Sequence, residues 1–570
     1  MSVRRSNRSH LLLALLLACF AIWPLTAPGY FAEAHDAPHS LFFLVEFDQA
    51  IRDGALIPRW GTDHALGYGY PTFVYISPLS YYVAEGFYLA GAGVTAAVKL
   101  TFALAMLLSA LGMFLLAREL VGPVAACVAA TVYVYAPYRF LDMYVRADLA
   151  ESSALALFPW VCWAFWRLAT RPDLRHISIA AVAYGALLLT HNLTAFLFTP
   201  LLSVFVLFAL WQHGRLRQRR AWVTCLTAAM LAVGIASFSL LPALLERSYI
   251  SQQQWTRGSY DFAQHFVYPG QLLSPFWGYG HDVPGANDGM SLQVGLAPLL
   301  LAMGGVFLGG LGKSRRALTF FLALGMVGYL FLVLPYSEAV WRALPVLALV
   351  QFPWRLLSMV VFCAALVAAV MSQQLAEVAA GPGAAVALAL AVVTAGIGYA
   401  QPQHTPPSAR AESPLAVIDF ELEYPDMIGI TTWVQQPPTD SPKLAAYLAG
   451  QPLPLAEADI PGAQVEAVYH GGHVQAVRVH MPADGQLHFY TYYFPGWRAY
   501  VDGQEVPIWP SGPQAIITLA LSAGEHNVTI RFGETPLRAA AKWVTLVAVA
   551  ITTLLSTRPI KLFGVGKLPC

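Results

Sequence analysis

The chain has 570 residues, of which 57% are hydrophobic and only 11% are charged, whereas an ordinary soluble domain carries about 25% charged residues. This composition predicts a polytopic membrane protein, and the net charge of +1 excludes nucleic acid as a partner, since no basic surface is expected. The six cysteines include no CxxC spacing, which argues against a zinc site or a disulfide framework.

Apolar runs of about the length needed to cross a bilayer recur along the chain. The first follows a basic N-terminus, and Ala32-Glu33-Ala34 resembles a signal-peptide cleavage site. We favour an uncleaved first helix over a signal peptide, because the run is nearly long enough to span and many more spans follow. We predict twelve spans, near residues 11–28, 96–117, 121–137, 150–168, 176–190, 193–211, 221–244, 291–311, 317–335, 355–374, 383–400 and 538–556.

Basic residues orient these spans, because they collect on the cytoplasmic side of a membrane protein. With twelve spans, the basic N-terminus, the basic loops and the C-terminal tail all fall on one side. A thirteenth span over 78–93, an aromatic segment interrupted by Glu85, would place later basic loops on the other side. We therefore expect 78–93 to be interfacial or re-entrant, and both termini to be cytoplasmic.

The same count divides the chain into a transmembrane domain, 1–400, an extracytoplasmic region, 401–536, and a final span with a cytoplasmic tail, 537–570. Three outer loops, 29–95, 137–149 and 246–290, face the same compartment as the region 401–536. That region predicts short strands with turns at Gly471-Gly472 and Asp502-Gly503, a rhythm typical of a β-sandwich. We expect this β-sandwich to act as a lid or a partner-binding module.

The stretch AEAHDAPHSLFFL, residues 32 to 44, places three polar side chains just beyond the first span. Asp36 stands at or just before the start of an amphipathic helix, which we expect to lie along the membrane surface and to end at Gly54. His39 lies one turn further on, and His35 precedes Asp36. Asp36 could act as a general base or hold a divalent cation, or it could simply cap the helix.

Other charged or histidine side chains stand at the outer ends of spans, where charge is costly and often functional. Mutual salt bridges, interfacial anchoring and ordinary packing are the alternative explanations. Arg355 beside Trp354 suits a phosphate group, because guanidinium binds phosphate in a forked geometry. The Gly-rich loop 274–295 could order over a substrate, or it could be a plain surface loop. The candidates are Asp142, Arg146, Asp148, Glu151, His191, Trp354, Arg355, His281 and Asp282.

Several of these segments resemble known families. HDAPHSLFF at the start of the first outer loop resembles the C-type glycosyltransferase superfamily (GT-C). More narrowly, IRDGALIPRW, GYGYPTFVYISPLSYY, YVRADLAE, LLTHNLTA and QFPWRLL, in this order, are similar to the bacterial membrane proteins called 6-pyruvoyl-tetrahydropterin synthase-related. FPGWRAYVDGQEVP and SAGEHNVTIRF are similar to the C-terminal region of YfhO-like membrane proteins.

The resemblance implies a GT-C-like α-helical enzyme of the bacterial inner membrane that uses polyprenyl-phosphate-linked sugars. It implies that Asp36 is the catalytic base or a metal ligand, and that Asp142, Asp148 or Glu151 assists. No DxD or WWD motif is visible, so Mg²⁺ or Mn²⁺ is a candidate cofactor rather than an established one.

We therefore predict transfer of a sugar from a polyprenyl-phosphate donor to an extracytoplasmic acceptor, which would be a cell-envelope glycan, a lipid or a protein. Arg355 or Arg146 would hold the donor phosphate, Asp36 would deprotonate the acceptor, and His39 would orient Asp36 or contact the acceptor. The alternative is a non-catalytic transport, lipid-handling or scaffold protein. Transport would call for ionisable residues in the middle of spans, but here the charges cluster at the outer ends.

Overall fold

The computed structural model describes residues 2–31, 33–251, 258–311, 315–377, 381–406 and 408–557. A helix occupies each of the twelve predicted span positions, because each apolar run can satisfy its backbone hydrogen bonds internally only as a helix in lipid. These helices are α1 (Ser2–Ile22), α5 (Val94–Leu120), α6 (Pro123–Tyr135), α8 (Leu149–Thr170), α9 (Leu174–Thr190), α10 (Asn192–Gln212), α11 (Arg219–Leu245), α12 (Leu296–Leu311), α13 (Arg316–Val333), α15 (Leu357–Leu375), α16 (Gly381–Gly396) and α19 (Pro536–Thr557).

Seven of the described helices are long and apolar enough to cross a membrane by themselves. An eighth span results if α6 and the segment Pro137–Arg146, which meet at a bend of 49°, are counted as one span. Three further apolar helical segments, at α9, α12 and α16, are shorter. Helices are therefore found at the predicted positions, and seven or eight of them have the length and composition of a full span.

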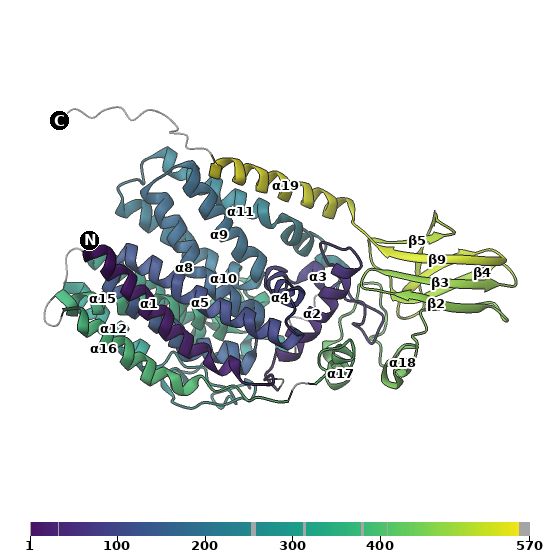
Figure 1. Cartoon of the computed structure of the whole chain (residues 1–570), viewed down its shortest axis with the longest axis horizontal. Coiled ribbons are helices and arrows are strands. Elements are labelled where there is room, and N and C mark those ends of the chain that lie inside the picture. Colours follow the sequence, from purple (N-terminus) through teal and green to yellow (C-terminus); the bar gives the residue numbers. More distant parts are fainter. Residues whose placement is uncertain are drawn as a thin grey trace.

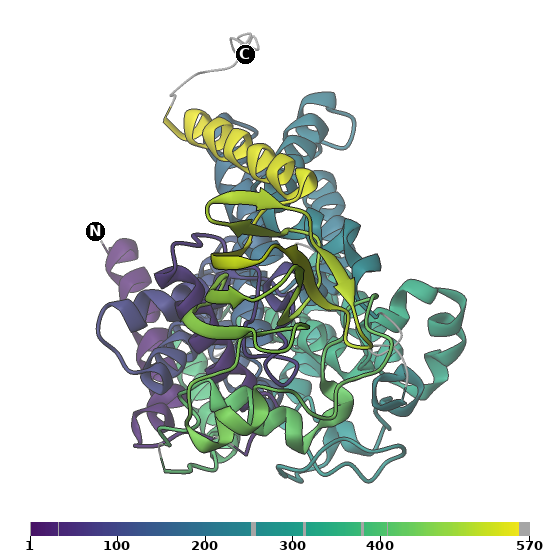
Figure 2. The same cartoon turned by 90° about the vertical axis from the view of Figure 1, so that its right-hand side faces the viewer.

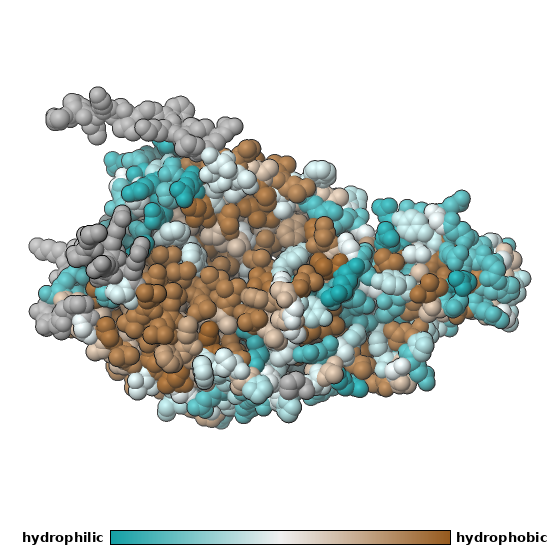
Figure 3. Space-filling view, viewed as in Figure 1, coloured by the Kyte–Doolittle hydropathy of each residue, from teal (hydrophilic) through white to brown (hydrophobic). Residues whose placement is uncertain are grey.

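The helices form one body, and the strands lie at one end of it (Figure 1). Figure 2 looks onto the strands, with the helical body behind them. The face of the helical body that Figure 3 shows is broadly apolar between two more polar ends, as expected for a protein that meets lipid along its middle. Helix α1 begins and α19 ends at the end remote from the strands (Figure 1).

Basic residues near the ends of several helices contact the ends of neighbouring helices. Arg167 lies 2.8 Å from Glu119, and Arg215 donates to the carbonyl of Thr170 over 2.9 Å. These contacts join the ends of α5, α8 and α10, as the predicted grouping of basic loops requires. The predicted C-terminal tail, 558–570, lies outside the described residues.

Among the described residues, nine strands form two antiparallel sheets, with orders β1-β4-β8-β7 and β2-β3-β9-β5-β6. The two predicted turns are present, and Asp502 and Gly503 both have positive φ, 49° and 85°, as a tight hairpin turn requires. The strands are β1 (Ala456–Ala458), β2 (Gln464–His470), β3 (Val474–Met481), β4 (Gly485–Tyr492), β5 (Trp497–Val501), β6 (Gln504–Val506), β7 (Trp509–Ser511), β8 (Ile516–Leu521) and β9 (Gly524–Phe532).

The first outer loop completes the core of this sandwich. Trp60 is fully buried, and its ring lies 5.2 Å from the ring of Trp497 and 5.1 Å from that of Phe532. Tyr68 stacks on Tyr492 with ring centroids 5.2 Å apart. A lid that swings freely would have to expose these rings, so the packing favours a β-sandwich fixed to the helical body.

Buried polar contacts add to this attachment. The carboxylate of Asp63 accepts hydrogen bonds from the hydroxyl of Tyr447 and, over 3.1 Å, from Nε2 of His470. Glu46 accepts the backbone N–H of Thr62 over 2.6 Å. Since each of these polar groups would cost free energy if buried alone, the contacts favour one arrangement of the loop and the C-terminal region.

The short helices lie in the connections. They are α2 (Ala37–Arg52), α3 (Thr72–Tyr75), α4 (Leu79–Leu89), α7 (Pro137–Phe140), α14 (Glu338–Ala343), α17 (Leu415–Glu423) and α18 (Leu444–Ala449). With 11 residues, α4 is too short to cross a bilayer about 30 Å thick at about 1.5 Å per residue. This agrees with the prediction that 78–93 does not span.

Two segments are more enclosed by the protein than their sequences indicate. Helix α2 is largely enclosed by protein, because Leu44 and Phe47 pack in the helical core while Phe42 packs against α17; its place at the membrane surface stays a prediction. The segment 137–149 is not an open loop, because residues 137–146 form α7 and the π-helical turn η2 (Leu141–Arg146) and are all buried. In both cases, contacts with distant parts of the chain bury a segment whose own sequence pattern predicts a surface position.

We expect Trp60→Ala to destabilise the purified protein by about 3–5 kcal/mol, because it leaves a cavity in the shared core. Thermal unfolding in detergent and protease cleavage within 456–532 would measure this loss. Leu56→Ala is the matched control, since Leu56 is in the same loop but 79% exposed. Unfolding of Trp60→Ala at the wild-type temperature would contradict the shared core.

Candidate functional site

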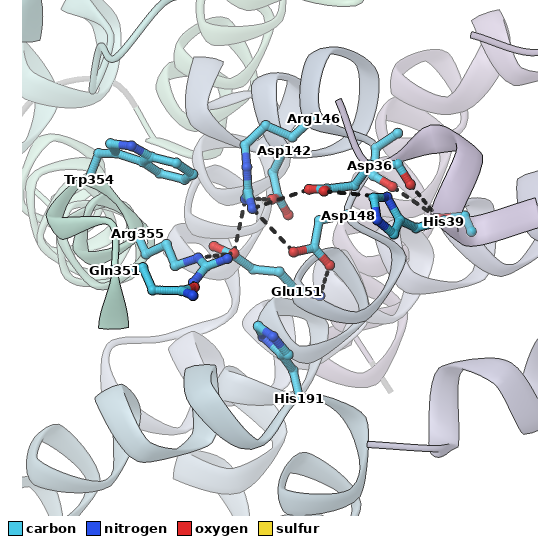
Figure 4. A network of polar contacts seen from close by, with 12 residues as sticks. Asp36, His39, Asp142, Arg146, Asp148, Glu151, His191, Gln351, Trp354 and Arg355 are labelled. Carbon is cyan, nitrogen blue, oxygen red and sulfur yellow. Dashed lines mark hydrogen bonds and ion pairs between the residues drawn. The ribbon is translucent and has the colours of Figure 1, made fainter. Parts of the chain in front are cut away.

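Arg146 lies at the centre of a buried network of charged side chains (Figure 4). Its Nη1 is 2.5 Å from Asp142 Oδ1 and 2.9 Å from Glu151 Oε2. Its Nη2 is 3.2 Å from Asp148 Oδ2 and 3.7 Å from Asp36 Oδ2. The Arg146 side chain is only 3% exposed, so its charge must be paired where it lies.

The backbone around Arg146 explains this convergence. The π-helical turn η2 puts Asp142 and Arg146 on the same side of a widened turn, a feature common at functional sites. Ala147 then has a left-handed backbone with φ 56°, which ends the turn. Asp148 caps α8, because its Oδ1 accepts the N–H of Glu151 over 2.8 Å. The chain thus turns back and brings Glu151 to Arg146.

Asp36 occupies the N-cap position of α2 but makes no side-chain capping bond. Its carboxylate points instead toward Arg146, and its backbone N–H donates to the Arg146 carbonyl over 2.6 Å. The Asp36 side chain is 40% exposed, against 0% to 14% for the other three carboxylates around Arg146. Capping alone therefore does not explain Asp36, which is the accessible carboxylate of the network.

His39 is the nearest histidine to Asp36, with Nδ1 4.0 Å from Oδ1. Although the Asp36 side chain is 40% exposed, the protein around it limits the solvation of its carboxylate and so raises its pKa; the charge of Asp148 raises this pKa further, against the opposing effect of Arg146. Burial lowers the pKa of His39 in spite of the attraction of Asp36. Asp36 is therefore a stronger base than an ordinary aspartate, and a neutral His39 stands beside it.

Arg355 enters the network from another segment, the 3₁₀ turn η10 (Pro353–Leu356) that precedes α15. Its Nε lies 3.2 Å from Glu151 Oε2, and its Nη1 donates to the carbonyl of Val350 over 3.1 Å. The neighbouring Trp354 ring lies 4.5 Å from the Arg146 guanidinium carbon, within cation–π range. Trp354 therefore covers one side of Arg146, while Arg355 extends the network toward α15.

The third outer loop also reaches the network. His281 stacks on His35 with ring centroids 4.2 Å apart. Asp282 accepts the Trp354 indole N–H over 2.8 Å and lies 2.5 Å from His265 Nδ1. Although burial acts to raise the pKa of Asp282, the bond from His265 and then that from Trp354 hold this pKa below its ordinary value. The two predicted loop residues thus contact the network: His281 touches His35, and Asp282 binds the indole of Trp354.

His191 lies between α9 and α10, on the Glu151 side of the network (Figure 4), and its Nδ1 is 2.6 Å from Thr194 Oγ1. All the predicted site residues therefore lie in or beside one cluster. Sequence reasoning missed two members, Tyr138, which donates to Glu151 over 2.9 Å, and His265. Tyr138 sits in an apolar aromatic run and His265 in a loop, and neither position carries a signal in the sequence.

The donor set does not suit a divalent cation. In the described part of the chain, no group of three or more His, Cys, Asp or Glu side chains is arranged to hold a metal ion. The carboxylates of the cluster contact guanidinium groups, with Asp142 and Glu151 on Arg146 and Glu151 also on Arg355. The mechanism proposed below therefore uses these side chains alone.

Two hollows lie near the third outer loop. One, of about 320 Å³, is lined by both polar and apolar residues, among them Gln271, Phe276 and Asp288. The other, of about 300 Å³, is lined by Leu272, Leu273 and by apolar residues of α12 and α13. Neither contains a residue of the charged cluster, so the chemistry of the site is inferred from the cluster itself.

Comparisons with known proteins give a family and several similar folds. A family model described as the 6-pyruvoyl-tetrahydropterin synthase related domain of membrane proteins matches residues 73–401, which is more than half of the chain. An uncharacterized protein of Lactococcus lactis subsp. cremoris is 19% identical over 247 residues, which cover 42% of this chain and 40% of that protein.

Three solved structures are similar over parts of their length. Arabinofuranosyltransferase AftD from Mycobacteria has a TM-score of 0.42 at 14% identity, covering 70% of this chain and 26% of AftD. ArnT from Cupriavidus metallidurans bound to undecaprenyl phosphate has a TM-score of 0.33 at 15% identity, with coverages of 64% and 59%. The Archaeoglobus fulgidus oligosaccharyltransferase, in complex with Zn and sulfate, has a TM-score of 0.36 at 15% identity, with coverages of 70% and 54%. This chain spans less than two thirds of each of these proteins, and the scores describe a partial likeness of fold.

We expect Arg146→Met to destabilise the protein by about 3–5 kcal/mol, because it leaves buried carboxylates without their cation. The double variant Arg146→Met/Asp142→Asn removes one of those charges and should recover part of the loss. Thermal unfolding of the purified proteins measures both effects. If Arg146→Met unfolds like the wild type, the network does not depend on its central cation.

Acid should weaken the His35–His281 contact. Burial and the neighbouring His281 lower the pKa of His35 from 6.5 to about 4, so the unfolded chain takes up a proton at higher pH than the folded one. Stability that depends on neutral His35 is therefore lost as the pH falls from about 6.5 to about 4.

His35→Gln should accordingly lose less melting temperature than the wild type over this range. His480→Gln, at an exposed position of β3, is the control and should retain the wild-type loss. Equal losses in His35→Gln and the wild type would show that the His35 ring does not contribute to the acid sensitivity.

Proposed function

We propose that this chain, which belongs to the 6-pyruvoyl-tetrahydropterin synthase related family of membrane proteins, transfers a sugar from a polyprenyl-phosphate-linked donor to an extracytoplasmic acceptor. The family match confirms the resemblance read from the sequence, and the family's description carries no implication of pterin chemistry here. The observation that supports the proposal is Asp36, an accessible carboxylate held beside a buried, fully paired cation. This arrangement suits a base that acts where a lipid-borne and a water-borne substrate meet.

In the proposed reaction, Asp36 accepts the proton of an acceptor hydroxyl while the hydroxyl oxygen attacks the anomeric carbon of the donor sugar. The bond between that carbon and the phosphate oxygen breaks, and polyprenyl phosphate leaves with the electron pair. The configuration at the anomeric carbon is inverted. The raised pKa of Asp36 favours proton acceptance, and the neutral His39 ring is placed to orient Asp36 or the acceptor.

Arg355 is the better of the two arginines for the leaving phosphate. Arg146 is enclosed, and both of its terminal nitrogens contact carboxylates. Arg355 contacts one carboxylate, Glu151, and otherwise the neutral oxygens of Val350 and Gln351. The charge of Arg355 is therefore less fully neutralised by carboxylates than that of Arg146. It is better able to stabilise the negative charge that develops on a leaving phosphate.

The apolar hollow offers a place for part of an isoprenoid chain. Its lining includes Leu299 and Met303 of α12 and Leu330 of α13. Helix α13 also packs against η10, the turn that carries Arg355. A lipid tail in this hollow would therefore lie near the element that we propose to hold its phosphate.

Asp36→Asn should trap the donor, because an amide cannot accept the acceptor's proton. Mass spectrometry of lipids that co-purify with the protein should detect a polyprenyl-phosphate sugar on Asp36→Asn. The wild type should carry less of it, or polyprenyl phosphate alone. Asp48→Asn is the matched control, since Asp48 lies on the same helix and pairs with Arg52, and it should behave like the wild type.

A polyprenyl-phosphate sugar on neither protein, or identical ordinary phospholipids on both, would count against glycosyl transfer. That result would favour the scaffold or lipid-handling alternative. Equal donor retention by Asp36→Asn and Asp48→Asn would place the effect on α2 as a whole, and so contradict the specific role of Asp36.

A further inference from the structure

We propose that Phe420 and Glu421 of α17 are positioning residues for the His39–Asp36 pair. This inference rests on the proposed function, in which Asp36 is the base, and adds to it an element from a distant part of the chain. Helix α17 belongs to the region 401–536, yet it packs against α2, which carries His39 in its first turn.

The orientation of His39 depends on packing more than on hydrogen bonding. In the described structure its Nδ1 is buried without a hydrogen-bond partner, and its nearest carboxylate oxygen, on Asp36, is 4.0 Å away. Phe420 is the aromatic ring nearest to it, edge to face, with ring centroids 4.4 Å apart and planes at 68°. Phe42 and Phe43 lie further away, at 5.1 Å and 5.6 Å. Phe420 is therefore the main wall against which the His39 ring rests.

Glu421, the next residue, fixes the position of α17 itself. Its two carboxylate oxygens accept the backbone N–H groups of Ala65 and Leu66 over 2.8 Å and 2.7 Å. Both residues have left-handed backbones, with φ of 54° and 55°, a conformation that costs free energy for residues other than glycine. Two hydrogen bonds to one buried carboxylate hold this unfavourable turn in place, and hold α17 to it.

The same turn leads back to α2. His64, beside Ala65, lies with Nδ1 3.7 Å from Glu421 Oε1. Its ring is 5.6 Å from the rings of both Phe42 and Phe43, the other two aromatic neighbours of His39. The contacts thus form a closed ring from His39 through α17 and the turn to α2, so that a shift of α17 reaches His39 from two sides.

A further contact holds the chain just before α17. Thr405 and Tyr30 exchange two backbone hydrogen bonds, of 3.0 Å and 2.6 Å. Tyr30 lies six residues before Asp36, so the connection from α16 to α17 is attached beside the segment that carries the base. Helix α17 is therefore fixed both before and within its own length.

The test replaces the ring with a smaller side chain that is still apolar. Phe420→Leu should free the His39 ring, Phe420→Tyr should restore the wild-type behaviour, and Glu421→Gln should act in the same direction as Phe420→Leu, because its amide N–H₂ cannot accept a backbone N–H. Tyr424→Leu is the matched control, since Tyr424 directly follows α17, its ring lies 5.0 Å from that of Phe420, and it is 37% exposed.

The first readout is the rate at which diethyl pyrocarbonate modifies His39, measured by peptide mass spectrometry on full-length protein. We expect a several-fold increase for Phe420→Leu and Glu421→Gln, with no change at His480. The second readout is the co-purified lipid. Phe420→Leu should retain the polyprenyl-phosphate sugar as Asp36→Asn does, because donor binding survives while proton transfer is impaired.

The two readouts separate the two proposals. A faster reaction of His39 without any donor lipid on any variant would support the positioning role and contradict the proposed function. Unchanged modification of His39 in Phe420→Leu and Glu421→Gln would overturn the positioning role, whatever lipid is found. So would an equal increase in Tyr424→Leu, because the effect would then belong to α17 in general.

Discussion

The Arg146 guanidinium, enclosed in an apolar body and paired with carboxylates from three segments, is the interaction on which the site depends. A buried cation is tolerated only when its charge is met on every side, and this requirement brings α2, η2 and the start of α8 together. Because Asp142, Asp148 and Glu151 already neutralise the cation, the fourth carboxylate, Asp36, stays at the edge and accessible. One accessible base is thus a consequence of the charge balance of the buried group.

Helix α2 connects this charge network to the β-sandwich. Asp36 is its N-cap and His39 lies in its first turn, while Glu46, further along, accepts a hydrogen bond from the loop that inserts Trp60 into the sandwich core. The region that follows residue 401 therefore contributes to the geometry of the site. Its helix α17 lies against His39, and its strands share a core with the first outer loop, so both ends of the chain define the geometry of α2.

Much of this could be predicted from the sequence, because apolar runs and tight turns are local signals. The helix positions, the hairpin turn at Asp502-Gly503 and the charged candidates of the cluster all follow from neighbouring residues. The burial of α2 and of 137–146 could not be predicted, since it depends on segments hundreds of residues away. Phe420 and His265 were missed for the same reason, because an aromatic ring or a lone histidine shows its role only through its distant neighbour.

The shared core of Trp60, Trp497 and Phe532 also has a consequence for biosynthesis. Trp60 leaves the ribosome more than four hundred residues before its partner strands do, and at about 5–20 residues per second this is roughly 20 to 90 s. During that interval the nascent first loop must wait with its large aromatic side chains uncovered, while most of the helices are inserted. Such delayed, long-range closure slows folding, and it leaves aromatic surface of the emerging chain exposed to aggregation until the strands have been made.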